Sequence, residues 1–404
     1  MVDKKRVAVL FGGRSVEHDI SVVSGLQALA AIDGSRFDAF PVYVDFSGAL
    51  WFGPALRERK NFIPDAAALA NLDRVTLDVS TPGSPQFTSG KAPGLFGGKR
   101  ATYPFDVALP VFHGTFGEDG SIQGLFDFYG IPYTGMRTMA AAVAMDKVAT
   151  KLLLSGSGVQ TLPHVLVERP QSGFIIGKDV LQGLLGDMAF PVIVKPATLG
   201  SSIGVALAKD IDELAAVLPG VLKLDNRAVV EPAVQNLVEY NVSVSRLFGQ
   251  TGVSAIERPK SSSALLDFKE KYLSGSSTKK LGGASAAQNS GGMLSLTRDI
   301  NPDMPADIRE KVVAWSKIAF ERLAGTGAPR IDFLSNRETG EVYLNEVNAT
   351  PGSLAYFLWE AADTPVLFTE FLTALIEEGL RLKRPQSQFS DPVPEGARLF
   401  PKRG

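Results

Sequence analysis

The alternation of apolar and polar positions predicts a sheet at the start of the chain. Residues 6–11 form a β-branched and apolar run, a pair of glycines follows, and apolar residues then recur at helical spacing from Ile20 to Ala30. Further strand-like runs occupy residues 40–44 and 107–112. A strand, a glycine turn, a helix and a second strand make a βαβ unit, so this part of the chain predicts an open parallel sheet.

The middle of the chain has a different pattern, in which shorter strands predominate. Strand-like runs at residues 190–195, 205–208 and 228–231 surround a glycine–serine loop and a helix expected over residues 210–218. One continuous helix is expected over residues 136–155, after a glycine-containing turn. These elements predict a small α+β unit.

The last part of the chain predicts a polar hairpin and an amphipathic helix. Residues 240–247 alternate like a half-buried strand, and residues 308–323 have helical periodicity. Two strands, at residues 330–334 and 341–346, enclose a turn. A last helix is expected to begin at Thr364-Pro365.

These patterns divide the chain into three domains of an α/β protein, with α+β character in the second and third. The first domain is residues 1–135 with an insertion at about 51–100, the second is residues 136–234, and the third is residues 235–383. Within the third domain, the segment at about 261–292 contains a low-complexity stretch at residues 274–292 that is interpreted as a linker or a lid. Residues 384–404 are expected to form a tail.

Composition and charge exclude several classes of protein. Of the 404 residues 45% are hydrophobic, and 41 Lys and Arg against 43 Asp and Glu give a net charge of -2, so no overall attraction to nucleic acid or membranes is expected. No apolar run reaches the roughly 18 to 20 residues that span a bilayer, and no signal-peptide segment precedes the first strand, which predicts a cytoplasmic protein. Without cysteine and with only three histidines, a metal site should be oxygen-lined and suited to Mg²⁺.

Four polar residues on the C-terminal hairpin are the strongest chemical signal. Arg330 and Asp332 lie on one predicted strand, and Glu346 and Asn348 lie on the next. Because side chains alternate along a strand, each pair lies on one face. Two carboxylates and an amide oxygen suit Mg²⁺, while Arg330 can neutralise charge that develops on a reacting oxygen. The alternative is a solvated hairpin with an Asp–Arg pair.

A second signal is the glycine–serine loop that follows Lys195. Gly200, Ser201, Ser202 and Gly204 expose several backbone N–H groups, and such a loop can close over phosphates. The loop lacks the GxxxxGK[ST] spacing of a Walker P-loop. An ordinary hairpin turn is the alternative interpretation.

Seven segments carry a family resemblance. They read LFGGRSVEHDIS, PVFHGTFGEDGSIQGLFDFYGIPYTG, AMDK, FPVIVKPATLGSSIGV, FKEKYLS, PRIDF and NEVNATPG. In this order they resemble the ATP-grasp superfamily and, within it, the D-alanine:D-alanine ligases, from Lys5 to about Leu382. The resemblance implies a three-domain fold with ATP held between the central and C-terminal domains. It also implies two Mg²⁺ ions, with Mn²⁺ as an alternative, and a homodimer.

The resemblance assigns an ATP and metal site to the second and third domains. The residues implied are Lys147, Lys195, Ser202 and Lys271 for the phosphates, Glu231, Val234 and Glu239 for adenine and ribose, and Asp332, Glu346 and Asn348 for the metal ions.

The resemblance also assigns the first amino-acid substrate. Glu17 matches the acid that holds its ammonium group, although in isolation Glu17 would be interpreted as a charge that stabilises a helix N-terminus. Ser201 and Tyr272 match residues that link to Glu17 across the site and fasten the lid. His113 matches a histidine near the first substrate, whereas a lone histidine more often has a structural part.

The implied reaction moves the γ-phosphoryl group of ATP to a carboxylate and then joins the acyl phosphate to an amine. Arg330 and the Gly352 N–H are implied to stabilise the oxyanion of the tetrahedral intermediate. The leading prediction is therefore an ADP-forming ligase that joins two D-alanines into D-alanyl-D-alanine for peptidoglycan precursors.

One segment departs from the family pattern. Where the pattern has a serine that binds the carboxylate of the second substrate, the spacing of NATPGSLAYFLWE places Phe357. Ser353 and Leu354 are the candidate substrate residues here, and Tyr356 is another replacement for the lost hydroxyl. A ligase with another acceptor, such as D-serine, an L-amino acid or a short peptide, is therefore the first alternative, and a nucleotide-binding regulator without turnover is the second.

Overall fold

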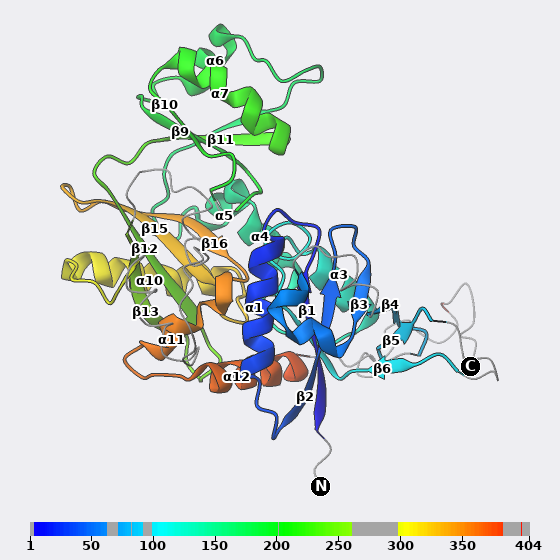
Figure 1. Cartoon of the computed structure of the whole chain (residues 1–404). Helices are drawn as coiled ribbons and strands as arrows, with labels where there is room; N and C mark the ends of the chain where they lie inside the picture. Colours follow the sequence, from blue (N-terminus) through cyan, green and yellow to red (C-terminus); the bar gives the residue numbers. More distant parts are fainter. Residues whose placement is uncertain are drawn as a thin grey trace, which may run out of the picture.

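The described part of the chain is built around three β-sheets that follow one another in sequence. The structure, a computed structural model, describes residues 4–62, 72–81, 83–91, 99–200, 202–260, 298–382 and 397. The second sheet forms a separate lobe at the top of Figure 1, and the first and third sheets form the body below it. In the part of the chain that is described, no helix has both the length and the apolar character to cross a membrane.

The first sheet is mixed and not fully parallel. Its strand order is β6-β5-β4-β3-β2-β1-β7, in which only β2, β1 and β7 run parallel. The bounds are β1 Lys5–Gly12, β2 Phe37–Val44, β3 Leu50–Phe52, β4 Asp73–Asp78, β5 Gln86–Ser89, β6 Thr102–Pro104 and β7 Val107–Pro110. The segment interpreted as an insertion thus supplies antiparallel strands that extend the sheet. They were missed because each is only 3 to 6 residues long and little periodicity can be read from so short a run.

Helices cover both faces of the first sheet. These are α1 His18–Ala31, the short η1 Pro54–Arg57 and η2 Arg59–Phe62, and α3 Ser121–Tyr129. The face under α1 is completed by α12 Phe368–Arg381, the last helix in the described part of the chain, because Phe371 and Ile376 pack in one core with Val9 and Leu109. Residues near position 370 therefore pack against the first sheet.

The second sheet is small and antiparallel. Its order is β10-β9-β11-β8, with bounds β8 Val165–Glu168, β9 Val192–Pro196, β10 Ala206–Ala208 and β11 Arg227–Pro232. It is covered by α6 Lys178–Leu185 and α7 Ile211–Leu224, whose buried residues Leu181, Leu214 and Leu218 pack on Val194. Helix α7 runs further than expected, because it continues through Pro219.

The helix expected over residues 136–155 is in fact two helices, α4 Thr138–Met145 and α5 Lys147–Leu154. Asp146 separates them, because its backbone is extended and its carboxylate accepts hydrogen bonds from the N–H groups of Val148 and Ala149 at 2.9 and 3.0 Å. This is an N-cap, which starts a new helix. The break places Lys147 at the first turn of α5.

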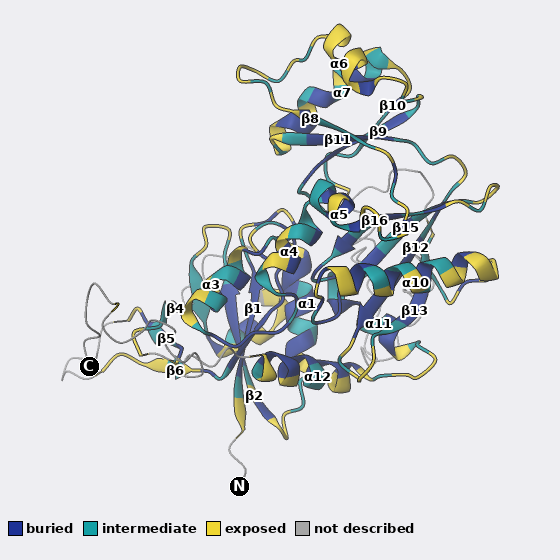
Figure 2. Ribbon diagram, turned by 180° about the vertical axis from the view of Figure 1, so that it is seen from behind, coloured by how far each residue is buried: buried dark blue, intermediate teal, exposed yellow. Residues whose placement is uncertain are grey.

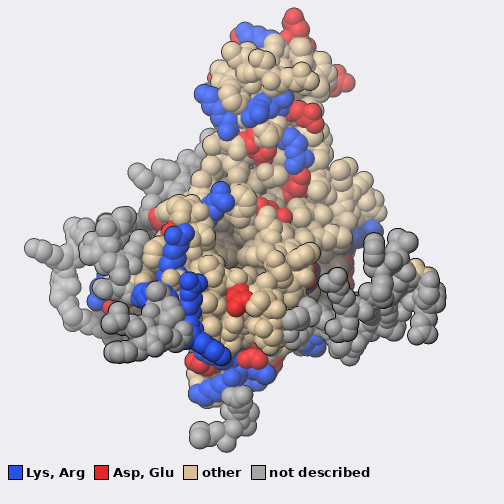
Figure 3. Space-filling model, turned by 90° about the vertical axis from the view of Figure 1, so that its right-hand side faces the viewer, with Lys and Arg blue, Asp and Glu red and all other residues tan. Residues whose placement is uncertain are grey.

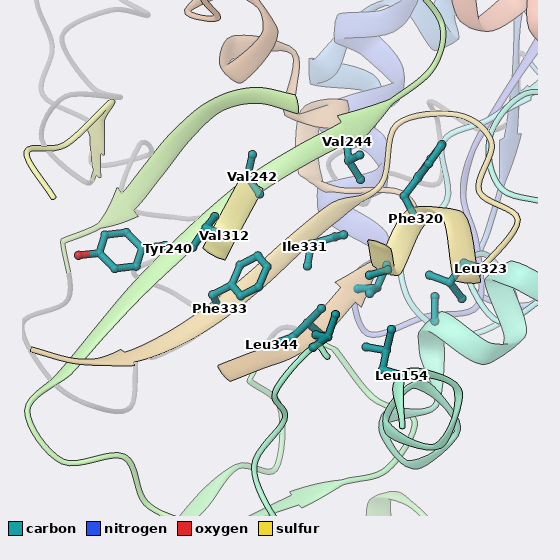
Figure 4. Packing of buried hydrophobic residues seen from close by; sticks show 14 of the residues in the cluster. Leu154, Tyr240, Val242, Val244, Val312, Phe320, Leu323, Ile331, Phe333 and Leu344 are labelled. Atoms are coloured by element: carbon teal, nitrogen blue, oxygen red, sulfur yellow. The ribbon is translucent and has the colours of Figure 1, made fainter. Parts of the chain in front are cut away.

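The third sheet is antiparallel and carries an extensive hydrophobic core. Its order is β14-β13-β12-β15-β16, with bounds β12 Leu237–Ser245, β13 Gly252–Pro259, β14 Arg298–Ile300, β15 Arg330–Asn336 and β16 Val342–Asn348. One face packs on α10 Ala306–Arg322, and Figure 4 shows Val312 and Phe320 of that helix against Val242, Ile331 and Phe333 of the strands. The alternate residues of these strands point to the opposite face.

Two short elements follow the third sheet. They are η3 Gly352–Ala355 and α11 Tyr356–Glu360. The last helix, α12, begins at Phe368 and not at Thr364-Pro365, and Glu370 accepts the Leu367 N–H at its start. Figure 2 shows that the central strands are buried, whereas the outward faces of α10 and α12 are exposed.

Candidate active site

A row of four polar residues crosses the third sheet on the face away from α10. The strand register pairs Glu257 with Asn241, Asn241 with Asp332, and Asp332 with Glu346. The Asn241 amide donates a hydrogen bond to Glu257 Oε1 at 3.0 Å. The sequence showed only the Asp332 and Glu346 end of this row, because the pairing of the other strands is a long-range feature.

Arg330 and Asn348, which are cross-strand partners, both bind Asp332. Arg330 donates from Nε and Nη2 to the two oxygens of Asp332 at 2.7 Å each, and Asn348 Nδ2 donates to Oδ2 at 2.9 Å. Burial raises the pKa of Asp332, Arg330 opposes the rise, and the charge of Glu346 adds to it. A cation between the two carboxylates would relieve this repulsion.

The donor set of Asp332, Glu346 and Asn348 fits Mg²⁺. No group of three His, Asp or Glu residues that could hold a metal occurs among the described residues. Mg²⁺, however, usually takes only one or two carboxylates from a protein and completes its shell with water and substrate phosphate oxygens. Two carboxylates and an amide oxygen at one end of a hairpin match a site of that kind. The metal-binding role of these residues stays a prediction.

A pocket opens beside Glu346, and its walls bring together residues from all three predicted domains. Its lining includes Glu17, Glu118, Lys147 and Gly200. The buried Lys147 ammonium donates to a backbone carbonyl of the glycine–serine loop at 2.6 Å and lies 3.6 Å from Glu346 Oε2. Charged side chains of both signs lie where the upper lobe meets the body (Figure 3). The structure therefore joins the lysine, the loop and the hairpin that the sequence marked separately.

Lys195 belongs to a buried chain of ion pairs. Glu231 lies 2.6 Å from Lys195 through one oxygen and 2.6 Å from Lys151 through the other. Lys195 also donates to Asn345 Oδ1 at 2.9 Å. Burial alone would raise the pKa of Glu231, but the two lysines outweigh it and lower the pKa. Lys151 was missed, although it follows Lys147 by four residues, a spacing that puts both on one face of a helix.

Two buried carboxylates, Glu17 and Glu118, also line the pocket. Glu17 precedes α1, and no capping hydrogen bond from its side chain is present. Glu118 accepts the N–H of Gly114 at 2.7 Å and the N–H of Thr350 at 2.6 Å. Despite these bonds, burial and the charge of Glu17 raise the pKa of Glu118 to about 8. Glu118 therefore holds a proton at neutral pH, which sequence reasoning did not find.

His113 is part of a directed hydrogen-bond chain. Its Nδ1 lies 2.6 Å from the carbonyl of Thr350, which only accepts, so Nδ1 carries the hydrogen. Burial lowers the pKa of His113 to about 4, so the ring is neutral and Nε2 accepts from Ser24 Oγ at 2.9 Å. Ser24 Oγ accepts in turn from the Ser353 N–H at 2.8 Å. The chain fastens both ends of the turn that contains Gly352.

The backbone of this turn is strained. Ser353, Leu354 and Ala355 have φ angles of 53°, 54° and 49°, three consecutive left-handed residues that are not glycine. Each such residue costs about 1–3 kcal/mol and persists only where its surroundings hold it. The Leu354 side chain lies in the hydrophobic core with Val9 and not in the pocket. The contacts of Ser24 and His113 therefore hold the backbone near Gly352 in place.

The remaining predicted residues are placed as follows. Ser202 lies in the glycine–serine loop with φ 58°, Val234 is half-buried after β11, and Glu239 lies on β12 two residues before Asn241 and on the same face. Ser201, Lys271, Tyr272 and the lid at about 261–292 lie outside the described residues. The tail at 384–404 lies outside them too, apart from residue 397.

Comparison with known proteins matches most of the chain. The family model described as the N-terminus of D-ala D-ala ligase matches residues 6–136, and the one described as the C-terminus matches residues 153–377. The chain belongs to the D-alanine:D-alanine ligase family. The fold predicted from that resemblance is confirmed, since relatives and structural neighbours with this name match nearly the full length.

Members of the D-alanine:D-alanine ligase family from other organisms are similar over most of their length. The D-alanine–D-alanine ligase of Wolinella succinogenes is 34% identical over 354 residues, which cover 88% of this chain and 89% of that protein. The one from Thermosipho melanesiensis is 30% identical over 374 residues and 93% of each chain.

Solved structures of the D-alanine:D-alanine ligase family share the fold. The D-alanine-D-alanine ligase of Coxiella burnetii matches with a TM-score of 0.73 at 22% identity, over 94% of this chain and 95% of that one. The VanG D-Ala:D-Ser ligase of Enterococcus faecalis matches with a TM-score of 0.71 at 23% identity, over 93% of this chain and 100% of that one.

Proposed function

We propose that this protein joins two D-alanine molecules into D-alanyl-D-alanine, with ATP converted to ADP and phosphate. The supporting observation is the convergence of the Asp332–Glu346 row, Lys147 and the Glu17–Glu118 pair on one pocket. Phosphoryl transfer needs cations and donors around phosphate oxygens, and ligation needs a held ammonium group and a stabilised oxyanion. The pocket and the row beside it offer groups of both kinds.

The proposed roles follow from charge and position. Lys147 and Lys195 bind phosphate oxygens, and Asp332, Glu346 and Asn348 hold Mg²⁺, which when bound neutralises phosphate charge. The other nucleotide contacts, and Lys271, Ser201 and Tyr272, keep the roles that the family resemblance implies. These assignments are proposals that site variants will test.

In the same pocket, Glu17 would hold the ammonium of the first D-alanine. Arg330 and the Gly352 N–H would stabilise the oxyanion that forms when the second amine attacks. Because the chain through His113 fixes the turn on both sides, that N–H needs no reorganisation during the reaction.

The experiment that tests this function is a product assay. The purified protein is incubated with ATP, Mg²⁺ and D-alanine, phosphate release is measured, and the product is identified by mass spectrometry. D-alanyl-D-alanine with one phosphate per dipeptide is the expected result. Phosphate release with another amino acid and none with D-alanine would overturn the assignment of D-alanine in favour of another acceptor or donor.

Proton release on substrate binding is a direct consequence of the carboxylate pair. An ammonium group beside Glu17 stabilises the charged form of Glu118 and lowers its pKa from about 8. Binding of D-alanine at pH 7 should therefore release up to one proton, and the release should disappear well above pH 8. Calorimetry in two buffers of different ionisation enthalpy measures it. Glu118→Gln should abolish the release, whereas the exposed Glu338→Gln should not, and equal heats in both buffers at pH 7 would contradict the argument.

A second acceptor deserves a direct test because one structural neighbour is a D-Ala:D-Ser ligase by name. Phe357, at the position where the family pattern has a serine, is the observation in this chain that favours such an alternative. Competition between D-serine and D-alanine in the product assay distinguishes the two acceptors.

The proposal includes a homodimer in the cytoplasm. Helices α3 and α4 pack together and expose Phe128, 80% accessible, and Met139, 65% accessible, which is costly for a free surface. Phe128→Arg should convert the dimer into a monomer in light scattering. Ile175→Arg, at an equally exposed apolar residue of the upper lobe, should leave the dimer intact. A monomer before any substitution would rule the dimer out.

A further inference from the structure

Arg298, the first residue of β14, has an unusual set of contacts. Its Nη1 donates to Glu257 Oε2 at 2.8 Å, and its Cζ lies 4.7 Å from the centre of the Phe357 ring. Its Nε is buried and has no hydrogen-bond partner within the described ranges of the chain. The guanidinium is thus held by two neighbours and still has a donor to offer.

Arg298 lies on the face of the third sheet that carries the polar row. Glu257 is the end of the polar row that continues through Asn241 to Asp332. Helix α11, which carries Phe357, is fixed to the same face, because Trp359 Nε1 donates to Ser243 Oγ at 3.0 Å and Ser243 lies two residues after Asn241 on β12. Arg298 therefore lies between the polar row and the helix that follows the Gly352 turn.

The chemistry of this arrangement favours a carboxylate. A guanidinium has five N–H donors in a planar fork that matches the two oxygens of a carboxylate. The ring of Phe357 supports the plane of the fork from one side. Glu257, which is only 2% exposed, binds one edge of the Arg298 guanidinium and holds it in position. A buried donor without a partner is costly, so an anionic ligand at this position gains both charge and a satisfied N–H.

We propose that Arg298 binds the carboxylate of the second substrate, the molecule whose amine attacks the acyl phosphate. This inference rests on the proposed function and specifies its acceptor as an amine that carries a nearby carboxylate. Phe357 then has a defined part, because it replaces a hydroxyl contact with a surface that orients a cation. Specificity for the acceptor thus comes from Arg298 together with Phe357.

The test is a competition between two acceptors that differ only in this group. D-Alanine and D-alaninamide are supplied at equal concentration with ATP and Mg²⁺, and the two dipeptide products are quantified by mass spectrometry. D-Alaninamide has no carboxylate, so it cannot serve as the first substrate. The unmodified protein should favour the acid product strongly, and Arg298→Met should lower the acid-to-amide ratio by roughly 10- to 100-fold, the effect of losing a charge-assisted hydrogen bond.

Three further variants make the outcome decisive. Arg258→Met removes an arginine from the neighbouring strand, where it pairs with Asp299 at 2.8 Å, and should leave the ratio unchanged. Arg298→Lys keeps the cation without the planar fork and should give an intermediate ratio. If Arg298→Met folds poorly because Glu257 is stranded, Arg298→Met/Glu257→Gln removes that charge and should show the same lowered ratio.

The possible failures are distinguishable. An unchanged ratio in an active, folded Arg298 variant would overturn this inference and leave the proposed function intact. No dipeptide from the unmodified protein with D-alanine would count against the proposed function itself.

Discussion

Replacement of Glu346 by alanine is expected to reduce Mg²⁺-dependent ADP formation by on the order of 1,000-fold. Glu346 faces Asp332 across the hairpin and lies 3.6 Å from Lys147, so its loss removes a proposed metal ligand and leaves the Lys147 charge without its nearest acid. The side chain is 22% exposed, and the fold should survive. ADP release at saturating ATP, with thermal unfolding measured in parallel, tests both statements.

The control for this variant lies on the same hairpin. Glu341 precedes β16 and is exposed, and Glu341→Ala should keep normal ADP release. Near-normal turnover in Glu346→Ala would contradict the proposal that Glu346 is a Mg²⁺ ligand. A loss that higher Mg²⁺ or Mn²⁺ concentrations partly restore would support it, because a weakened metal site fills again by mass action.

The substitution Lys151→Met should lower the free energy of unfolding by about 3–5 kcal/mol. The side chains of Lys151 and Glu231 are only 4% and 2% exposed, and removal of one partner leaves Glu231 with a single cation in a buried site. Because Glu231 also holds Lys195, the KM for ATP should rise while the KM for D-alanine stays unchanged. Urea unfolding and steady-state kinetics measure the two effects.

An exposed ion pair supplies the comparison. Lys178 and Asp212 lie 2.5 Å apart with side chains 56% and 69% exposed, so solvent screens the pair and Lys178→Met should change the free energy of unfolding little. Equal losses in the two variants would contradict the view that burial decides the energy of the Lys151 pair. A stability loss in Lys151→Met without any change in the KM for ATP would limit Lys151 to a structural part.

The polar cluster on the C-terminal hairpin could be predicted from local sequence. The two-residue spacing of Arg330 and Asp332 and of Glu346 and Asn348 fixes each pair on one side of its strand, and the structure brings all four together. The Lys195 strand and the loop after it also follow from local pattern. Such features are predictable because they depend on residues close together in the chain.

The rest of the site depends on contacts that no local pattern contains. Glu257 and Asn241 join the row only through strand register, and Glu118 pairs with Glu17 only after the first sheet has folded. The break at Asp146 was missed because the apolar pattern continues across it, and only the capping hydrogen bonds show that a new helix begins. Arg298 lies on a strand of only three residues, and its contact with Glu257 exists only after β13 and β14 have paired.

The closing of α12 on the first sheet has a consequence for synthesis on the ribosome. Phe368 follows Pro110 by 258 residues, so at roughly 5–20 residues per second the part of this face that α1 does not cover waits about 13 to 50 s for α12. During that interval Leu109 on β7, the strand that α12 contacts, would be partly open to solvent on the nascent chain. A fragment that ends before α12 should therefore aggregate or bind chaperones, although it contains every strand of the first sheet.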